Sequence, residues 1–135
     1  MSEMLSFSLE RKSVPVVLEN EDTKQPETFA IVELSGKARD DYMNVMGRKT
    51  KTTKDGSTTI QNFEGIMSSL LARSLFPCTH KKTPDGILCE SISDAPVPEA
   101  RIQNWPSSVQ KALFEVAKEI SGLDTEEEDD EEGNV

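Results

Sequence analysis

Residues 105–120 read WPSSVQKALFEVAKEI, in which apolar side chains recur at the three- and four-residue spacing of an amphipathic helix. The side chains expected on its buried face are Trp105, Val109, Ala112, Leu113, Val116 and Ile120. Gly122 follows closely, and glycine often ends a helix because it adopts the left-handed conformation without strain. This stretch therefore predicts a final helix, from about Trp105 to Ile120, that closes the folded domain.

The charge of the chain changes abruptly after this helix. Residues 1–123 carry 17 acids and 15 bases, whereas residues 124–135 carry eight acids and no base. Self-repulsion within such an acidic run predicts disorder. We therefore expect one globular domain at 1–123 and a disordered acidic tail at 124–135. The net charge of −10 also argues against nucleic-acid binding, in which Lys and Arg displace the counterions of the phosphates.

The N-terminal third of the sequence predicts strands. Residues 5–9 alternate apolar and polar side chains, which is the period of a half-buried strand. Val14–Leu18 is a second apolar run, and Pro15 lacks the N–H that a central strand needs, so this run is expected at a sheet edge. Glu19–Glu27 is polar and is expected to be a loop. Thr28–Leu34 is apolar on both faces, as in a central strand.

A first helix is expected directly after these strands. Ser35 is expected to cap it, because a serine hydroxyl can accept a hydrogen bond from a free N–H of the first turn. Its apolar stripe comprises Ala38, Tyr42, Val45 and Met46. Gly47 is expected to end the helix, and Lys49–Ser57 is expected to be a loop.

A second helix and a hairpin are expected next. The apolar spacing predicts a helix over Thr58–Phe76, with Gly65 inside it and Pro77 as its stop. Thr79–Glu90 predicts a hairpin around the turn residues Pro84-Asp85-Gly86. Residues 94–106 are rich in proline and are expected to be a linker. The fold class is then α+β: a small N-terminal, mostly antiparallel sheet followed by about three packed helices.

The side chains that could carry chemistry are few. Cys78, His80 and Cys89 offer three metal ligands, but a structural zinc site needs four, usually in closely spaced pairs. We therefore expect these residues to pack in the fold or lie on its surface. His80 is the only histidine and lies between a threonine and two lysines beside the hairpin turn, where an exposed position is expected. We expect no enzyme activity, catalytic residue, cofactor or metal.

The cellular setting is also bounded by the sequence. No charged segment followed by an apolar core opens the chain, and no apolar run reaches the length of a membrane span. We therefore expect a cytosolic protein without membrane contact, in which Cys78 and Cys89 stay reduced. The basic run at 48–54 has two interpretations, a mobile polar loop or a contact with an acidic protein surface.

A protein-binding role is the interpretation that these features favour. Trp105 is expected to anchor either the core or an interface, since tryptophan is common at both. The candidate partner-binding residues come from the edge strand and the final helix: Val14, Val16, Leu18, Trp105, Val109, Leu113 and Val116. Self-association through either of these elements is expected as well.

The order of elements and two local patterns resemble the tail assembly chaperones of long-tailed, siphovirus-type bacteriophages and prophages. The first pattern is Gly36-Lys37-Ala38-Arg39-Asp40-Asp41-Tyr42. The second begins at residues 96–99 (PVPE), continues through Ile102, Trp105-Pro106 and the final helix, and ends in Gly122-Leu123. The resemblance covers roughly residues 29–123 and rests on order and character more than on an invariant motif.

The resemblance implies a function and a set of partners. Such chaperones coat the helical tape measure protein before the tail tube polymerises, self-associate, and act in the host bacterial cytoplasm without entering the mature virion. The tail tube protein is a further candidate partner, and a longer frameshifted form is common in the family. Two other classes remain open: an acidic decoy that mimics DNA and inhibits a host DNA-binding enzyme, and an enzyme fragment that depends on His80.

Overall fold

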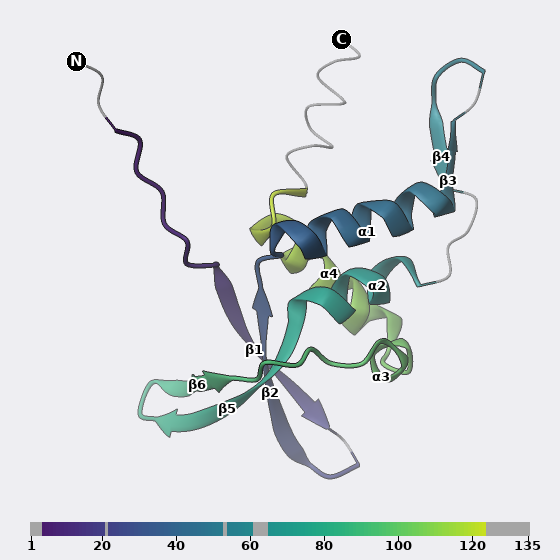
Figure 1. The fold of residues 1–135 in the computed structure, drawn as a ribbon. Coiled ribbons are helices and arrows are strands. Elements are labelled where there is room, and N and C mark those ends of the chain that lie inside the picture. The colour runs from purple at the N-terminus through teal and green to yellow at the C-terminus, as the bar shows by residue number, and fades with distance from the viewer. Residues whose placement is uncertain (1–3, 21, 53, 61–64, 124–135) are drawn as a thin grey trace.

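A four-stranded antiparallel sheet organises the computed structural model, which describes residues 4–20, 22–52, 54–60 and 65–123 (Figure 1). The strand order is β1-β2-β5-β6. The bounds are Ser13–Asn20 for β1, Gln25–Val32 for β2, Leu75–Thr83 for β5 and Gly86–Ile92 for β6. The predicted α+β class is therefore confirmed, although half of the sheet comes from the middle of the chain.

The first hairpin confirms two predictions and corrects one. β1 lies at the edge of the sheet and β2 lies inside it, as predicted. The predicted loop over Glu19–Glu27 is wrong, because β1 continues to Asn20 and β2 begins at Gln25. The Asn20 side chain accepts hydrogen bonds from the backbone N–H groups of Asp22 and Thr23, at 3.0 and 3.2 Å, which tightens the turn.

The alternating segment at residues 5–9 forms no strand in the structure. Residues 4–12 have no regular secondary structure, and the side chains of Leu5, Phe7 and Leu9 are almost completely exposed. The prediction is wrong because alternation alone supplies no hydrogen-bonding neighbour, and a strand is stable only against another one.

Helix α1 spans Gly36–Lys49 and begins as predicted. The Ala38 N–H donates to Ser35 Oγ at 3.2 Å, and Tyr42 is buried on the inner face. Gly47 does not end the helix, which continues to the C-cap Thr50.

The segment after α1 differs most from the prediction. Instead of a loop and a long helix, the chain forms a small hairpin, β3 (Thr50–Thr52) and β4 (Thr58–Ile60), followed by the short helix α2 (Ile66–Ser74). Part of the predicted helix, residues 61–64, lies outside the described residues. Gly65 takes φ +71° directly before α2, so it starts this helix rather than lying inside it.

The second hairpin and its surroundings also need a correction. β5 and β6 form the predicted hairpin, but β5 begins at Leu75, before Pro77. α2 therefore ends at Ser74 because the chain enters the sheet, where β5 pairs with β2.

The predicted linker at 94–106 is part of the folded core. It contains the short helix α3 (Glu99–Gln103), and Val97 and Ile102 are fully buried. The Val97 N–H donates to the Leu75 carbonyl at 2.9 Å, which ties the segment to β5. Helix α4 spans Ser107–Ile120 and stops before Gly122, which has φ +74°.

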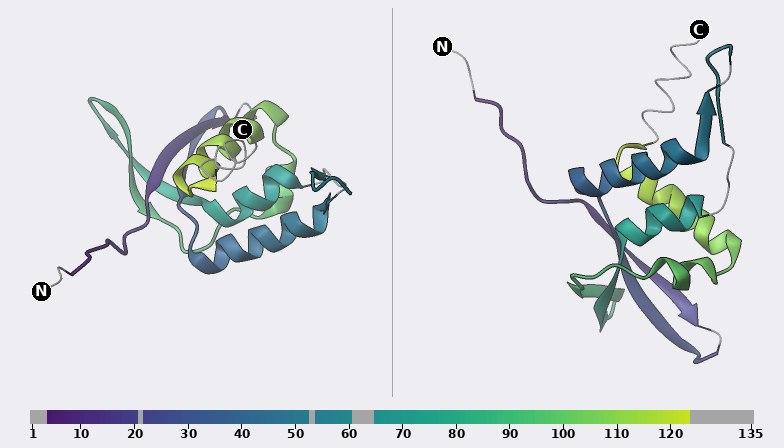
Figure 2. Two further views of the ribbon diagram at one scale, coloured as in Figure 1. Left: turned by 90° about the horizontal axis from the view of Figure 1, so that it is seen from above. Right: turned by 45° about the vertical axis from the view of Figure 1, so that its right-hand side comes forward.

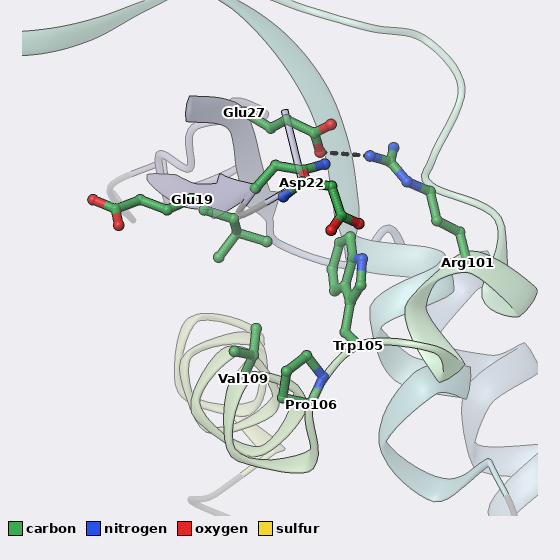
Figure 3. Close-up of a pocket in the computed structure, with 9 residues that line it drawn as sticks. Glu19, Asp22, Glu27, Arg101, Trp105, Pro106 and Val109 are labelled. Carbon is green, nitrogen blue, oxygen red and sulfur yellow. Dashed lines mark hydrogen bonds and ion pairs between the residues drawn. The ribbon is translucent and has the colours of Figure 1, made fainter. Parts of the chain in front are cut away.

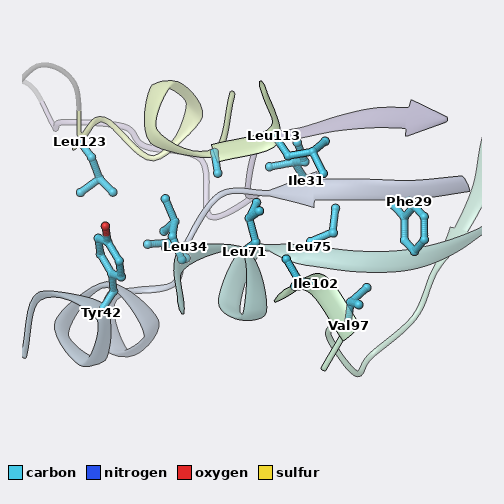
Figure 4. Packing of buried hydrophobic residues seen from close by; sticks show 12 residues of the cluster. Phe29, Ile31, Leu34, Tyr42, Leu71, Leu75, Val97, Ile102, Leu113 and Leu123 are labelled. Carbon is cyan, nitrogen blue, oxygen red and sulfur yellow. The ribbon is translucent and has the colours of Figure 1, made fainter. Parts of the chain in front are cut away.

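One hydrophobic cluster joins the helices to one face of the sheet (Figure 4). Its fully or largely buried members are Phe29, Ile31, Leu34, Tyr42, Leu70, Leu71, Leu75, Val97, Ile102, Leu113, Ala117 and Leu123. The helices are grouped together, and the β1–β2 and β5–β6 hairpins extend away from them (Figures 1 and 2). In the part of the chain that is described, no helix is both long and apolar enough to cross a membrane. Residues 124–135, predicted as an acidic tail, lie outside the described residues.

Candidate partner-binding cleft

A cleft of about 610 Å³ lies between the tip of the β1–β2 hairpin and the start of α4 (Figure 3). It forms because the hairpin extends beyond the helices while α3 and α4 meet beside it. The lining residues are Leu18, Glu19, Asn20, Asp22, Glu27, Arg101, Trp105, Pro106 and Val109. The lining combines four charged side chains with the apolar side chains of Leu18, Trp105, Pro106 and Val109.

Trp105 forms the centre of the apolar floor. Its ring meets Phe29 edge-on, with ring centroids 5.6 Å apart and planes at 61°. The backbone N–H of Trp105 donates to the Ile102 carbonyl at 3.0 Å, and the backbone carbonyl of Trp105 accepts from Gln110 Nε2 at 3.0 Å. The two backbone bonds hold the Trp105 main chain, and the Phe29 contact holds the ring. The indole is only half-buried, and its remaining surface faces the cleft (Figure 3).

Arg101 links the floor to the hairpin. Its guanidinium carbon lies 5.6 Å from the centroid of the Phe29 ring and 5.8 Å from that of Trp105, both within cation–π distance. The same guanidinium forms an ion pair with the Glu27 carboxylate (Figure 3). The pair bridges β2 and α3, but because both side chains are partly exposed it contributes little to stability.

The rim of the cleft is acidic. Three carboxylates, those of Glu19, Asp22 and Glu27, line it against the single positive charge of Arg101. Glu19 and Asp22 are exposed and make no ion pair with Arg101 in the structure. An apolar floor with a negative rim suits side chains that are apolar in the centre and basic at the edge.

The structure brings three of the seven candidate partner-binding residues into this cleft: Leu18, Trp105 and Val109. Val16 and Val116 are partly buried against the core cluster, and Leu113, 5% exposed, belongs to it. Val14 is half-buried on β1 outside the cleft. Their role in binding a partner stays a prediction.

The sequence did not predict the acidic rim, because residues 19–27 are expected from it to form a loop. Glu19, Asp22 and Glu27 are close in the sequence, and this density of acids was the available signal. Arg101 could not be assigned, because residues 94–106 were expected to be a linker rather than a wall of the cleft. Only the fold brings these two segments together.

The two cysteines and the histidine lie on the other face of the sheet. Both thiols are free, and the hydroxyl of Thr28 contacts the Cys78 carbonyl at 2.7 Å and His80 Nδ1 at 3.1 Å. Burial, followed by hydrogen bonding to Cys78, raises the pKa of Cys89 to about 11. Among the described residues, no three His, Cys, Asp or Glu side chains gather in a way that could hold a metal ion.

The basic run at 48–54 is not a simple loop. Its first two residues complete the last turn of α1, and the next three form β3, whereas residue 53 lies outside the described residues. Contact with an acidic surface stays a prediction.

With this geometry established, comparison with known proteins adds no relative: no family model, curated protein or solved structure matches the chain.

Proposed function

We propose that this protein is a tail assembly chaperone of a siphovirus-type phage or prophage. In this role it binds the tape measure protein in the host bacterial cytoplasm and keeps it soluble, without catalysis, and is absent from the mature virion. The cleft between β1–β2 and α4 is the proposed binding site. The observation that carries the proposal is the combination of an apolar floor centred on Trp105 with a negative rim.

The chemistry of the cleft suits a helical segment. An amphipathic helix inserts apolar side chains three and four residues apart into a groove, and its flanking residues meet the rim. A volume of about 610 Å³ is in the range of natural binding sites and leaves room for several such side chains. A long coiled-coil protein presents the required apolar stripe many times, which fits many copies of a small chaperone on one partner.

The first experiment is co-expression of this chain with the tape measure protein encoded by the same phage or prophage. We expect the tape measure protein to become soluble and to co-purify with several copies of the chaperone. A tape measure protein that stays insoluble and unbound would overturn the proposal.

The cleft is tested by charge reversal, which leaves the core untouched. In the double variant Glu19→Lys, Asp22→Lys, we expect affinity for the tape measure protein to fall about tenfold, because two rim attractions become repulsions. The matched control is Glu90→Lys, Glu119→Lys, which changes net charge equally at exposed sites away from the cleft. Equal loss of binding in both variants would show that overall charge, rather than the cleft, governs the interaction.

A further inference from the structure

The N-terminal arm, residues 4–12, is an apolar segment that nothing covers in the structure. The exposed fractions of Met4, Leu5, Phe7 and Leu9 are 82–98%. Leu5, Phe7 and Leu9 alternate with polar residues, so an extended arm presents all three on one side. Four large apolar side chains in full contact with water, on the same short segment, indicate a surface that is covered by a partner.

The arm is directed away from its own domain. The Glu33 N–H donates to the Lys12 carbonyl at 2.8 Å, and the Lys12 N–H donates to Glu33 Oε1 at 3.0 Å. These bonds continue the β1–β2 pairing one step further, so the arm leaves along the line of β1 (Figures 1 and 2). Residues 4–12 contain no Gly, Pro, Asn or Asp, the residues that favour a tight reversal.

The same chain has an apolar sheet surface that no helix covers. Phe29 and Ile31 of β2 face the core cluster, so the residues between and beside them face the opposite way. On that opposite side lies the open face, which we define as Val17, Val32, Phe76, Ile87 and Ile92. Val32, 7% exposed, forms its buried centre. Val17, Ile87 and Ile92 are 37–44% exposed.

Two hollows mark the open face. One, of about 420 Å³, is lined by Val32, Phe76 and Ile92 together with polar residues at the root of the arm and after β6. The other, of about 60 Å³, lies between Val17 and Ile87 and is also lined by the two cysteines. They give an extended strand places in which to seat side chains.

We propose that the arm of one copy of this chain docks on the open face of a second copy. The arm and the open face are both apolar, so each can cover the other. Because both belong to one chain, no other partner is needed to cover them. Leu5 and Leu9 are four residues apart, so an extended arm separates them by about 13 Å, which nearly matches the distance of about 14 Å between the outer strands of a four-stranded sheet. Leu5, Phe7 and Leu9 can therefore reach across the open face of the neighbour. This association is independent of the proposed tape measure contact, which uses the other side of β1.

The test measures oligomeric state by sedimentation velocity over a concentration series of the full chain. We expect the wild-type chain to associate as concentration rises. The arm variant Phe7→Asp, Leu9→Asp and the face variant Val17→Asp, Ile92→Asp are each expected to stay monomeric. Met43→Asp is the matched control, because Met43 is also 44% exposed but lies on α1, outside both surfaces. A monomeric wild-type chain at every concentration, or equal dissociation of the control, would overturn the proposal.

Mixing the two variants separates arm docking from damage to the fold. The face variant retains an intact arm, and the arm variant retains an intact open face. An equal mixture should therefore form a one-to-one complex, although each variant alone is monomeric. A mixture that stays monomeric, while circular dichroism shows both variants folded, would contradict docking between copies. No tape measure protein is present in this assay, so its result does not depend on the proposed function.

Discussion

Trp105 has a structural role and a proposed binding role in one side chain. Its inner edge packs on Phe29, and its outer surface lines the cleft. Because the indole is only half-buried, truncation removes less apolar contact than at a core position, where an aromatic-to-alanine change costs roughly 3–5 kcal/mol. We expect Trp105→Ala to lower the free energy of unfolding by about 2 kcal/mol in urea titrations.

The control for this variant is Trp105→Phe, which keeps an aromatic ring against Phe29 and should cost clearly less. Unchanged urea unfolding in Trp105→Ala would show that the indole serves the interface alone. A loss as large as that of a core aromatic would show that the cleft floor is closed in solution.

Cys89 provides a pH-dependent test of the sheet. Its pKa is raised to about 11, so the folded protein keeps the thiol protonated where an ordinary cysteine ionises near pH 9. Alkylation of Cys89 in the folded chain should therefore increase only as pH approaches 11, whereas urea-unfolded protein should react at lower pH. Mass spectrometry of iodoacetamide-treated protein checks this, and rapid alkylation of folded Cys89 near pH 9 would contradict it.

The raised pKa of Cys89 also determines how this thiol changes the stability of the fold with pH. Between pH 9 and pH 11 the unfolded chain loses the Cys89 proton before the folded chain does, so this group's contribution to stability falls as pH rises through that window.

At the scale of elements, two glycines at different places relative to a helix should respond in opposite directions to alanine. Gly65 has φ +71°, and a Cβ there would lie 3.1 Å from Glu99 Oε1. Gly47 lies inside α1, where a Cβ would meet nothing within 4 Å. We expect Gly65→Ala to destabilise the fold by about 1 kcal/mol or more, and Gly47→Ala to stabilise it by about 0.5–1 kcal/mol. Thermal unfolding measures the change in stability of each variant. A change in the same direction for both variants would contradict the assigned helix boundaries.

The segment between β6 and α4 makes a second prediction at this scale. Ile102 on α3 is fully buried, so Ile102→Ala should cost about 3 kcal/mol of unfolding free energy. The matched control is Ile92→Ala, at a position 39% exposed, which should cost about 1 kcal/mol or less. Chemical denaturation of both variants tests the element, because in a solvent-exposed linker Ile102→Ala would cost no more than Ile92→Ala.

These elements also show how far the sequence determined the fold. Strong local signals identified β2, the start of α1, the β5–β6 hairpin and α4, because periodicity, caps and turn residues act over a few neighbours. The linker prediction failed at Val97 and Ile102, because the burial of these two side chains depends on β5 and α2, which are distant in sequence. The cleft was found only in part for the same reason. Its apolar floor followed from helical and strand periodicity, whereas its charged rim required the β1–β2 turn and α3 to meet.

At the scale of the whole molecule, the charge of the cleft predicts how binding depends on salt. The exposed acids on the rim act through water and are screened as ionic strength rises. We expect the affinity of the wild-type chain for the proposed partner, the tape measure protein, to fall with added salt. The affinity of the Glu19→Lys, Asp22→Lys variant should not fall with added salt. Isothermal titration at several salt concentrations checks this. An affinity of the wild-type chain that does not change with salt would show that the rim makes no contact.

The sheet topology imposes an order on synthesis. β1 and β2 leave the ribosome together and can pair at once, but the second edge of β2 is completed only by β5. α1, β3, β4 and α2 are all translated in between. At ordinary rates of elongation this interval is on the order of seconds. During that time the nascent chain presents the unpaired, apolar edge of β2 to its surroundings. A protein proposed to shield another chain from aggregation therefore passes through a stage in which it needs the same protection.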